Sequence, residues 1–180
     1  MGIVPYEFTH FVDIPPSSLV PVPLTIFTAM FMHGGWIHLI SNMLFLWVFG
    51  NNVEDVLGHI KYLYFYIVCG VFASFLHIFT NINSHVPSVG ASGAIAGVMG
   101  AYLFLFPKVR IRTLVILIIF TQVIRLPAIF MLGYWILIQI LSGFAEVGVS
   151  KGAGVAWFAH IGVFFWFYSQ YYNEKTKCVL

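Results

Sequence analysis

A serine lies at the point where a largely polar loop runs into an apolar segment. Residues 89–93 read Val-Gly-Ala-Ser-Gly, with residues 81–88 before them and an apolar run to Phe106 after them. Ser92 is therefore predicted at the start of a helix, where unpaired backbone N–H groups and the helix dipole stabilise an oxygen that gains negative charge. The same pattern is typical of a serine that merely caps a helix, so this stretch alone leaves both interpretations open.

His160 is a candidate base for this hydroxyl. It lies early in the last apolar segment, and ionisable groups in such segments are costly and are functional candidates by default. A neutral imidazole hydrogen-bonded to Ser92 can take the hydroxyl proton and later return it to a leaving amine. The alternative is a histidine that ties two helices together by one hydrogen bond. The strongly polar residues within the apolar segments are few: His33, His38, Asn42, His77, Ser92, Gln139 and His160.

His38 and Asn42 are candidates for holding the negative oxygen of a reaction intermediate. They are four residues apart, so they share one face of a helix, and both side chains can donate hydrogen bonds. Together with the backbone N–H of Ser92 they form a candidate oxyanion hole. The alternative is interhelical hydrogen bonding, worth roughly 0.6 kcal/mol per bond. We interpret three other histidines as structural: His33, which anchors a loop beside Gly34 and Gly35, His59 and His77.

No carboxylate lies within the apolar segments to complete a catalytic triad. The acidic residues all fall outside them: Glu7, Asp13, Glu54, Asp55, Glu146 and Glu174. Serine chemistry here would therefore use a Ser–His dyad, whose base is less effective because no carboxylate orients it. The chain has no H-E-x-x-H motif and no acid beside these histidines, so we expect no metal site and no cofactor.

The composition places these residues in a membrane. Of the 180 residues, 61% are hydrophobic and 8% are charged, against roughly 25% charged residues in a soluble domain. We therefore predict an integral membrane protein in contact with lipid. The net charge of +2 is small and the basic residues are scattered, so nucleic acid is not an expected partner.

Five apolar segments predict an all-α, polytopic transmembrane helical bundle. They span residues 24–50, 61–80, 92–106, 128–143 and 152–172. The third is too short to cross a hydrocarbon core of roughly 30 Å by itself, so it must begin part-way down, next to protein or water. We expect residues 24–172 to form the membrane domain. Residues 1–23 are expected to form an extracytoplasmic loop region with a short helix near 16–19. Residues 107–127 are expected to form a basic turn followed by a membrane-associated connector, and residues 173–180 a cytoplasmic tail.

The positive charges orient the bundle. Most of them fall on one side, which we expect to face the cytoplasm: Lys61, Lys108, Arg110, Arg112, Arg125, Lys175 and Lys177. Ser92 then opens its helix from the extracytoplasmic half of a bacterial or archaeal type of plasma membrane. Residues 1–23 would lie outside with nothing before them to carry them across, so we expect an upstream transmembrane helix. Alternatively, the segment 24–50 inserts with its short N-terminal tail translocated.

Small residues indicate which helices approach the serine. Glycines recur along its helix: Gly90, Gly93, Gly97 and Gly100. Gly93 and Gly97 form a small-x-x-x-small pair, which lets another helix backbone come close. Small residues also flank His160, at Ala159 and Gly162. The last apolar segment is therefore the expected partner, and close packing would bring the imidazole towards the hydroxyl.

In combination, these motifs resemble the rhomboid family of intramembrane serine proteases. The matching residues are 33–38 (H-G-G-W-I-H) with Asn42, then 90–93 (G-A-S-G), then 159–162 (A-H-I-G), in the family's order on three segments. The resemblance covers about residues 22–172. It implies a helical bundle with a water-filled cavity open to the outer side. It also implies single-span membrane proteins as substrates, cut in or near a helix rich in small or helix-breaking residues.

The resemblance also implies a role for each motif residue. Ser92 would be the nucleophile and His160 the general base. The oxyanion and binding residues would be His38, Asn42, Gly90 and Gly93, together with the Ser92 N–H.

Two features depart from the family pattern. The family core has six spans, whereas five are counted here, and the missing span would precede residue 1. Some members carry a tyrosine four residues after the serine, stacked on the histidine, and that position is Ala96 here. The imidazole would then need another wall, for which Trp157 and Phe158 are the candidates.

Two functions other than proteolysis stay open. One is a non-catalytic rhomboid-like protein that binds and guides transmembrane helices, against which the presence of both Ser92 and His160 argues. The other is a small transporter or channel, which lacks an acid inside the spans to couple or select ions.

Overall fold

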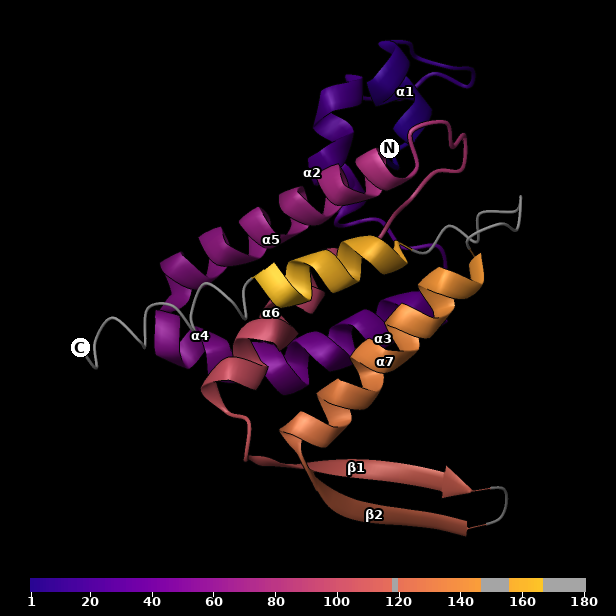
Figure 1. The fold of residues 1–180 in the computed structure, drawn as a ribbon. Coiled ribbons are helices and arrows are strands. Elements are labelled where there is room, and N and C mark those ends of the chain that lie inside the picture. The colour runs from indigo at the N-terminus through magenta and orange to yellow at the C-terminus, as the bar shows by residue number, and fades with distance from the viewer. Residues whose placement is uncertain (118–119, 147–155, 167–180) are drawn as a thin grey trace, which may run out of the picture.

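The described part of the chain is mostly helical. The computed structural model describes residues 1–117, 120–146 and 156–166, and Figure 1 shows a two-stranded sheet at one edge of the helices. In chain order the elements are α1 (Pro5–His10), the 3₁₀ turn η1 (Val22–Leu24), α2 (Thr25–Ala29), α3 (Trp36–Phe45), the π-helical turn η2 (Leu46–Gly50), α4 (Asn51–Leu57), α5 (His59–Thr80), α6 (Ser92–Leu105), β1 (Arg110–Leu117), β2 (Phe120–Pro127), α7 (Ala128–Glu146) and a last helix, Trp157–Trp166.

Two of the described helices are long and apolar enough to cross a membrane. They are α5 and the Ala128–Ala145 part of α7, whereas α6 and the last helix are apolar but shorter. α6 begins at Ser92, as the sequence predicts, whereas its depth in the membrane stays a prediction. By length and composition the described helices therefore support a membrane protein, while the five spans stay a prediction.

The first apolar segment becomes a continuous helix later than its composition predicts. In place of a span over 24–50, the long helical run begins at Trp36 and continues through η2 and α4 to Leu57. It ends at Gly58, whose φ of 78° a glycine adopts without strain. The polar stretch 51–57, which follows the predicted apolar segment, is therefore helical as well.

The N-terminal segment is anchored to the loop that leads to the serine. Its helix is α1, and the short helix expected near 16–19 is absent there. Pro5 occupies the first turn of α1, where the missing N–H leaves no intrahelical bond unmade. Ile3 and Ser88 exchange two backbone hydrogen bonds of 2.9 and 2.8 Å. The loop before Ser92 is thereby held against the start of the chain.

The expectation of an all-α fold is wrong at residues 110–127, which form an antiparallel hairpin. The strands β1 and β2 pair from Arg110 opposite Pro127 to Leu117 opposite Phe120. The hairpin is rich in β-branched residues, whose stiff side chains favour strands over helices: Ile111, Thr113, Val115, Ile116, Thr121, Val123 and Ile124. The apolar run 114–120 does not by itself indicate a strand, because membrane helices are equally apolar.

Glycines let α6 lie close to two neighbouring helices. A Cβ added at Gly97 would overlap Cys69 of α5 and lie 3.0 Å from Val163 of the last helix. A Cβ at Gly100 would overlap the backbone carbonyl of Phe164 in the last helix. The close approach of the last helix, expected from the small residues, is therefore made at these two positions.

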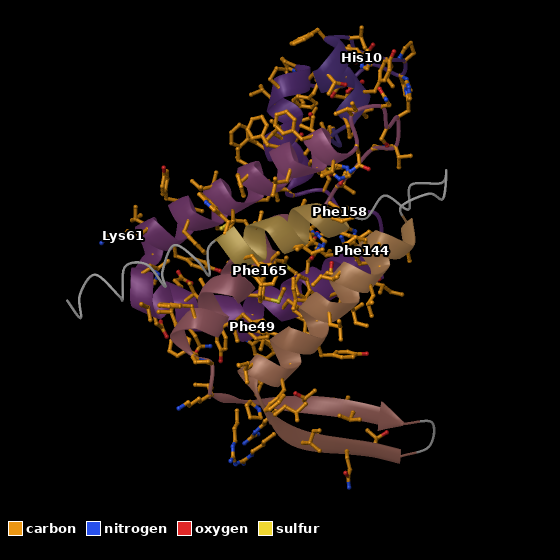
Figure 2. The ribbon with its side chains drawn as sticks, in the orientation of Figure 1. His10, Phe49, Lys61, Phe144, Phe158 and Phe165 are labelled. Carbon is orange, nitrogen blue, oxygen red and sulfur yellow. The ribbon has the colours of Figure 1, made fainter. Side chains whose placement is uncertain are left out.

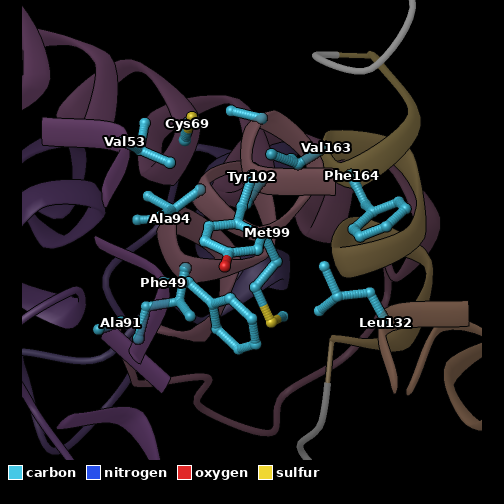
Figure 3. Packing of buried hydrophobic residues seen from close by; sticks show 14 of the residues in the cluster. Phe49, Val53, Cys69, Ala91, Ala94, Met99, Tyr102, Leu132, Val163 and Phe164 are labelled. Carbon is cyan, nitrogen blue, oxygen red and sulfur yellow. The ribbon is translucent and has the colours of Figure 1, made fainter. Parts of the chain in front are cut away.

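The other small residues pack elsewhere than predicted. Gly93 faces Ala73 and Gly162 faces Leu76, and both partners belong to α5. α6 is therefore in contact with α5 as well as with the last helix. Figure 3 shows the buried hydrophobic residues around α6. Among them, the Tyr102 ring of α6 lies near the Phe49 ring of η2, with the ring centroids 5.0 Å apart.

We expect Gly100→Ala to destabilise the fold by about 1–3 kcal/mol, because the added methyl group must push the backbone at Phe164 away. The matched control is Gly133→Ala on α7, where an added Cβ meets no atom within 4 Å. That control should be neutral or stabilising by up to about 1 kcal/mol, because alanine favours helix over glycine. Thermal unfolding of both variants in detergent measures the difference. Equal unfolding midpoints would contradict this account of α6 packing.

Candidate active site

The serine and the predicted base are hydrogen-bonded across two helices. The distance from Ser92 Oγ to His160 Nε2 is 2.8 Å. Ser92 occupies the first turn of α6, where the preceding Ala91 is the N-cap and makes no side-chain cap bond. The hydroxyl is bonded to the histidine of the last helix, so the interpretation of Ser92 as a helix cap is wrong. Ser92 is half-buried, whereas His160 is buried.

A third polar side chain completes a chain of hydrogen bonds. His160 Nδ1 lies 2.7 Å from the Oε1 atom of Gln139, a buried residue of α7. Gln139 is one of the few polar residues in the apolar segments, but the usual third group of a triad is a carboxylate, which Gln139 is not. The sequence signal for Gln139 is a polar side chain inside an apolar segment. That segment forms a helix next to the helix of His160.

His38 and Asn42 both lie next to the glycine that precedes the serine helix. A Cβ added at Gly90 would lie 2.7 Å from His38 Nε2 and 3.7 Å from Asn42 Nδ2. Gly90 has a φ of 128°, which glycine alone adopts readily. Its N–H donates to Ala29 O at 2.8 Å, which fixes the turn before Ser92. Gly90 therefore lies next to both side-chain candidates for the oxyanion hole, and its own role in binding stays a prediction.

Asn42 carries an unused hydrogen-bond donor. Its side chain is 6% exposed, and within the described residues its Nδ2 atom has no partner. A buried unpaired donor costs free energy of about 1–3 kcal/mol, so it requires an explanation. A site kept ready for an oxygen that arrives only during a reaction is one such explanation.

Two cavities meet at the serine and histidine. The smaller one, of about 70 Å³, is lined by Ser92, His38 and His160 together with Ser74 and His77 of α5. It also contacts Gly93, which the sequence assigned to binding and which packs against α5.

The larger cavity, of about 230 Å³, lies towards α3 and α7. Its lining includes the candidate oxyanion residues and two tryptophans: His38, Asn42, Ser92, Trp135, Gln139, Trp157 and His160. Both cavities are large enough for water, since a single site needs about 10–15 Å³.

The aromatic neighbour of the imidazole comes from α7. The Trp135 ring lies 6.1 Å from the His160 ring at an interplanar angle of 33°. Trp157, one of the two expected walls, lines the larger cavity, whereas Phe158 packs edge-on against Phe144 of α7 at 6.1 Å. Figure 2 shows Phe144 and Phe158 where α7 meets the last helix. Trp135 was missed because it lies in a different segment from the histidine.

The three histidines interpreted as structural differ in whether they lie near Ser92. His59 binds Glu54 at 2.6 Å, far from the serine in the chain and on the surface. His33 lies edge-on to His38, with ring centroids 5.2 Å apart. His77 is buried and lines the smaller cavity, so it contributes to the surroundings of the serine. In the described ranges, no cluster of three or more His, Cys, Asp or Glu residues is suited to a metal ion.

These groups are of the kinds that acyl transfer requires. They comprise a hydroxyl on a helix N-terminus, an imidazole within hydrogen-bond distance of it, and the unused donor of Asn42 beside both. In the first turn of a helix the backbone N–H of Ser92 also lacks an intrahelical acceptor. Attack on a carbonyl needs a nucleophile, a base and donors for the developing oxyanion, and candidates for all three line one cavity.

The chain is similar in sequence to several rhomboid and rhomboid-like proteins. The chain is 30% identical over 114 residues to the mouse presenilin-associated rhomboid-like protein, mitochondrial, covering 62% of this chain and 29% of that protein. It is 34% identical over 76 residues to RHOMBOID-like protein 5 of Arabidopsis thaliana, covering 42% and 25%. It is 32% identical over 99 residues to the yeast Rhomboid protein 1, mitochondrial, covering 53% and 29%.

The chain matches less than a third of the length of each of these relatives. Two of them are named as mitochondrial, which does not fit the plasma membrane expected from the sequence, so the kind of membrane stays a prediction. No solved structure gives a significant match. A family model described as the Rhomboid domain matches residues 22–169, which is most of the chain and includes all three motifs. The chain therefore belongs to the rhomboid family, as its motifs predicted.

Proposed function

We propose that this protein is an intramembrane serine endopeptidase that cleaves single-span transmembrane proteins. The observation that carries the proposal is the hydrogen bond of 2.8 Å between Ser92 Oγ and His160 Nε2, made between α6 and the last helix. Membership of the rhomboid family supports it, because that family includes serine proteases.

The first half of the proposed reaction forms an acyl-enzyme. Ser92 Oγ attacks the carbonyl carbon of the substrate, and its proton passes to His160 Nε2. The carbonyl oxygen becomes an oxyanion, which accepts hydrogen bonds from Asn42 Nδ2, from His38 and from the Ser92 N–H. The carbon–nitrogen bond then breaks, and His160 gives the proton to the departing amine.

The second half uses water from the cavity. A water molecule gives a proton to His160 Nε2 and attacks the acyl carbon, and the bond to Ser92 Oγ breaks as the proton returns to the serine. Hydrolysis inside an apolar bundle requires space for water near the serine. The two cavities that meet at Ser92 supply that space.

The substrate class follows from the place of the serine. Ser92 begins a helix that is too short to cross a bilayer alone, so the scissile bond would reach it within or close to the membrane. A substrate helix must unwind before its carbonyl can be attacked, which favours helices with small or helix-breaking residues. From the distribution of lysines and arginines we infer that the site opens towards the extracytoplasmic side.

The test is cleavage of a single-span reporter protein in liposomes that contain the purified protein. The proposal expects two defined fragments, whose ends are located by mass spectrometry, and none with Ser92→Ala. Ser142→Ala on α7 is the matched control and should retain activity. If Ser92→Ala and the unchanged protein give the same fragments, this serine is not the nucleophile. If a series of reporters binds without cleavage, a non-catalytic rhomboid-like role is favoured.

A further inference from the structure

Gln139 has a contact that the Ser–His dyad alone does not explain. Its Oε1 atom lies 2.7 Å from His160 Nδ1, the imidazole nitrogen that faces away from the serine. Both residues are buried, with 7% and 5% of their surfaces exposed. We propose that Gln139 is a positioning residue, whose amide oxygen selects the tautomer of His160 that can accept the Ser92 proton. This inference rests on the proposed function.

The tautomer follows from the donors and acceptors in this row of atoms. A neutral imidazole carries one N–H, and an amide oxygen accepts hydrogen bonds but cannot donate them. His160 Nδ1 must therefore carry the proton when it bonds to Gln139 Oε1. Nε2 then holds a free lone pair, which accepts the hydrogen bond of the Ser92 hydroxyl. This is the state that a general base requires.

Without Gln139, no hydrogen bond to Nδ1 would favour one tautomer of His160 over the other. In the described part of the chain, the His160 ring makes hydrogen bonds to Ser92 and Gln139 alone. In the other tautomer Nε2 carries the proton and donates it to the serine oxygen, so it cannot remove the hydroxyl proton. An orienting partner on the far nitrogen is the usual way in which proteins fix an imidazole tautomer.

An amide suits this position better than a carboxylate does. An ionised carboxylate buried among apolar helices would be costly, whereas a neutral amide offers an acceptor at a much smaller cost. When Nε2 takes the serine proton, Nδ1 keeps its own, so Gln139 Oε1 remains an acceptor throughout. Gln139 thus fixes the orientation and tautomer of the imidazole, as the acid of a triad does. It stabilises the imidazolium less than that acid would.

The alternative role for Gln139 is to join α7 to the last helix. Such a bond would contribute to stability but would leave the chemistry unaffected once the protein is folded. The two roles differ in the protonation of the ring. Nitrogen-15 NMR of histidine-labelled protein distinguishes Nδ1–H from Nε2–H directly, and it needs no substrate. The His160 signals are assigned by their loss in His160→Ala.

The test compares three variants of the full chain with the unchanged protein. Gln139→Met keeps the size and removes the acceptor, and Gln139→Glu keeps an acceptor at the same distance. Ile136→Val is the matched control, because it removes one buried methyl group from the same helix and removes neither hydrogen-bond partner of His160. Each is measured for thermal midpoint, kcat and KM of reporter cleavage, and the NMR tautomer of His160.

We expect Gln139→Met to lower kcat by about 10- to 100-fold with little change in KM, the range seen when outer-shell partners are lost. Its His160 should show a mixture of tautomers, where the unchanged protein shows Nδ1–H. Gln139→Glu should recover most of the kcat, and Ile136→Val should retain it. If Gln139→Met keeps both the tautomer and kcat, or if Ile136→Val loses as much kcat, Gln139 is structural and the inference is wrong.

The outcomes separate this inference from the proposed function. Loss of cleavage in Ser92→Ala with full activity in Gln139→Met would leave a protease whose base needs no positioning residue. Cleavage that survives in Ser92→Ala would overturn the proposed function. The NMR measurement would still test whether Gln139 sets the tautomer.

Discussion

Replacing His160 by alanine is expected to lower kcat by about a thousandfold or more, the upper range of a general base's contribution. The imidazole is the group that accepts the Ser92 proton, and the hydroxyl is a weak nucleophile without it. The double variant Ser92→Ala/His160→Ala should have the same residual rate as either single variant, because the two side chains act as one unit. Reporter cleavage in liposomes measures all three.

The control for this prediction is another histidine. His59→Ala removes an imidazole that is exposed and hydrogen-bonded to Glu54 on the surface, so its kcat should stay unchanged. A fall in the His59 variant would point to general damage. A His160→Ala variant that keeps a tenth or more of the activity, roughly 1.4 kcal/mol of lost transition-state stabilisation, would show that another group removes the proton.

Asn42→Ala is expected to lower kcat by about a hundredfold while KM changes little. Its Nδ2 atom is buried, has no partner within the described residues and lines the same cavity as Ser92. A donor that is used only when the oxyanion forms stabilises the transition state and not the bound substrate. The separate measurement of kcat and KM therefore tests the assignment directly.

Asn52→Ala is the matched control for this variant. Asn52 lies on α4, is exposed and donates to the backbone oxygen of Val48 at 3.3 Å. Its removal should leave both kinetic constants unchanged. A rise in KM without loss of kcat in Asn42→Ala would instead assign Asn42 to substrate binding. Asn42→Ala could also stabilise the fold, because it removes an unpaired buried donor. Such a gain is consistent with a role of Asn42 in oxyanion stabilisation and with a role in substrate binding.

Local motifs were enough to predict which serine and which histidine come together. Ser92 was placed by the change from a polar loop to an apolar helix, and His160 by its rarity as an ionisable group in such a segment. The glycines beside them predict close packing against the last helix, which Gly97 and Gly100 show and Gly93 does not. Gly93 proved to face α5, because a small residue permits any backbone to approach and specifies none.

The parts that the sequence did not predict depend on longer-range geometry. Gln139 and Trp135 reach His160 from α7, and their contacts depend on how α7 crosses the last helix. The sequence predicts a turn and an apolar connector at 110–127 in place of the hairpin, because hydropathy does not distinguish a strand from a membrane helix. Its β-branched residues were a local signal that composition outweighed.

The most direct test of the central claim is the position of a covalent adduct. A serine-reactive fluorophosphonate is added to the protein in detergent, and the modified residue is located by mass spectrometry of its peptides. We predict a single adduct on Ser92 that is absent from Ser92→Ala and forms far more slowly in His160→Ala. An adduct on a different serine, or an unmodified Ser92 in protein that still cleaves its reporter, would contradict the claim that this hydroxyl is activated by this imidazole.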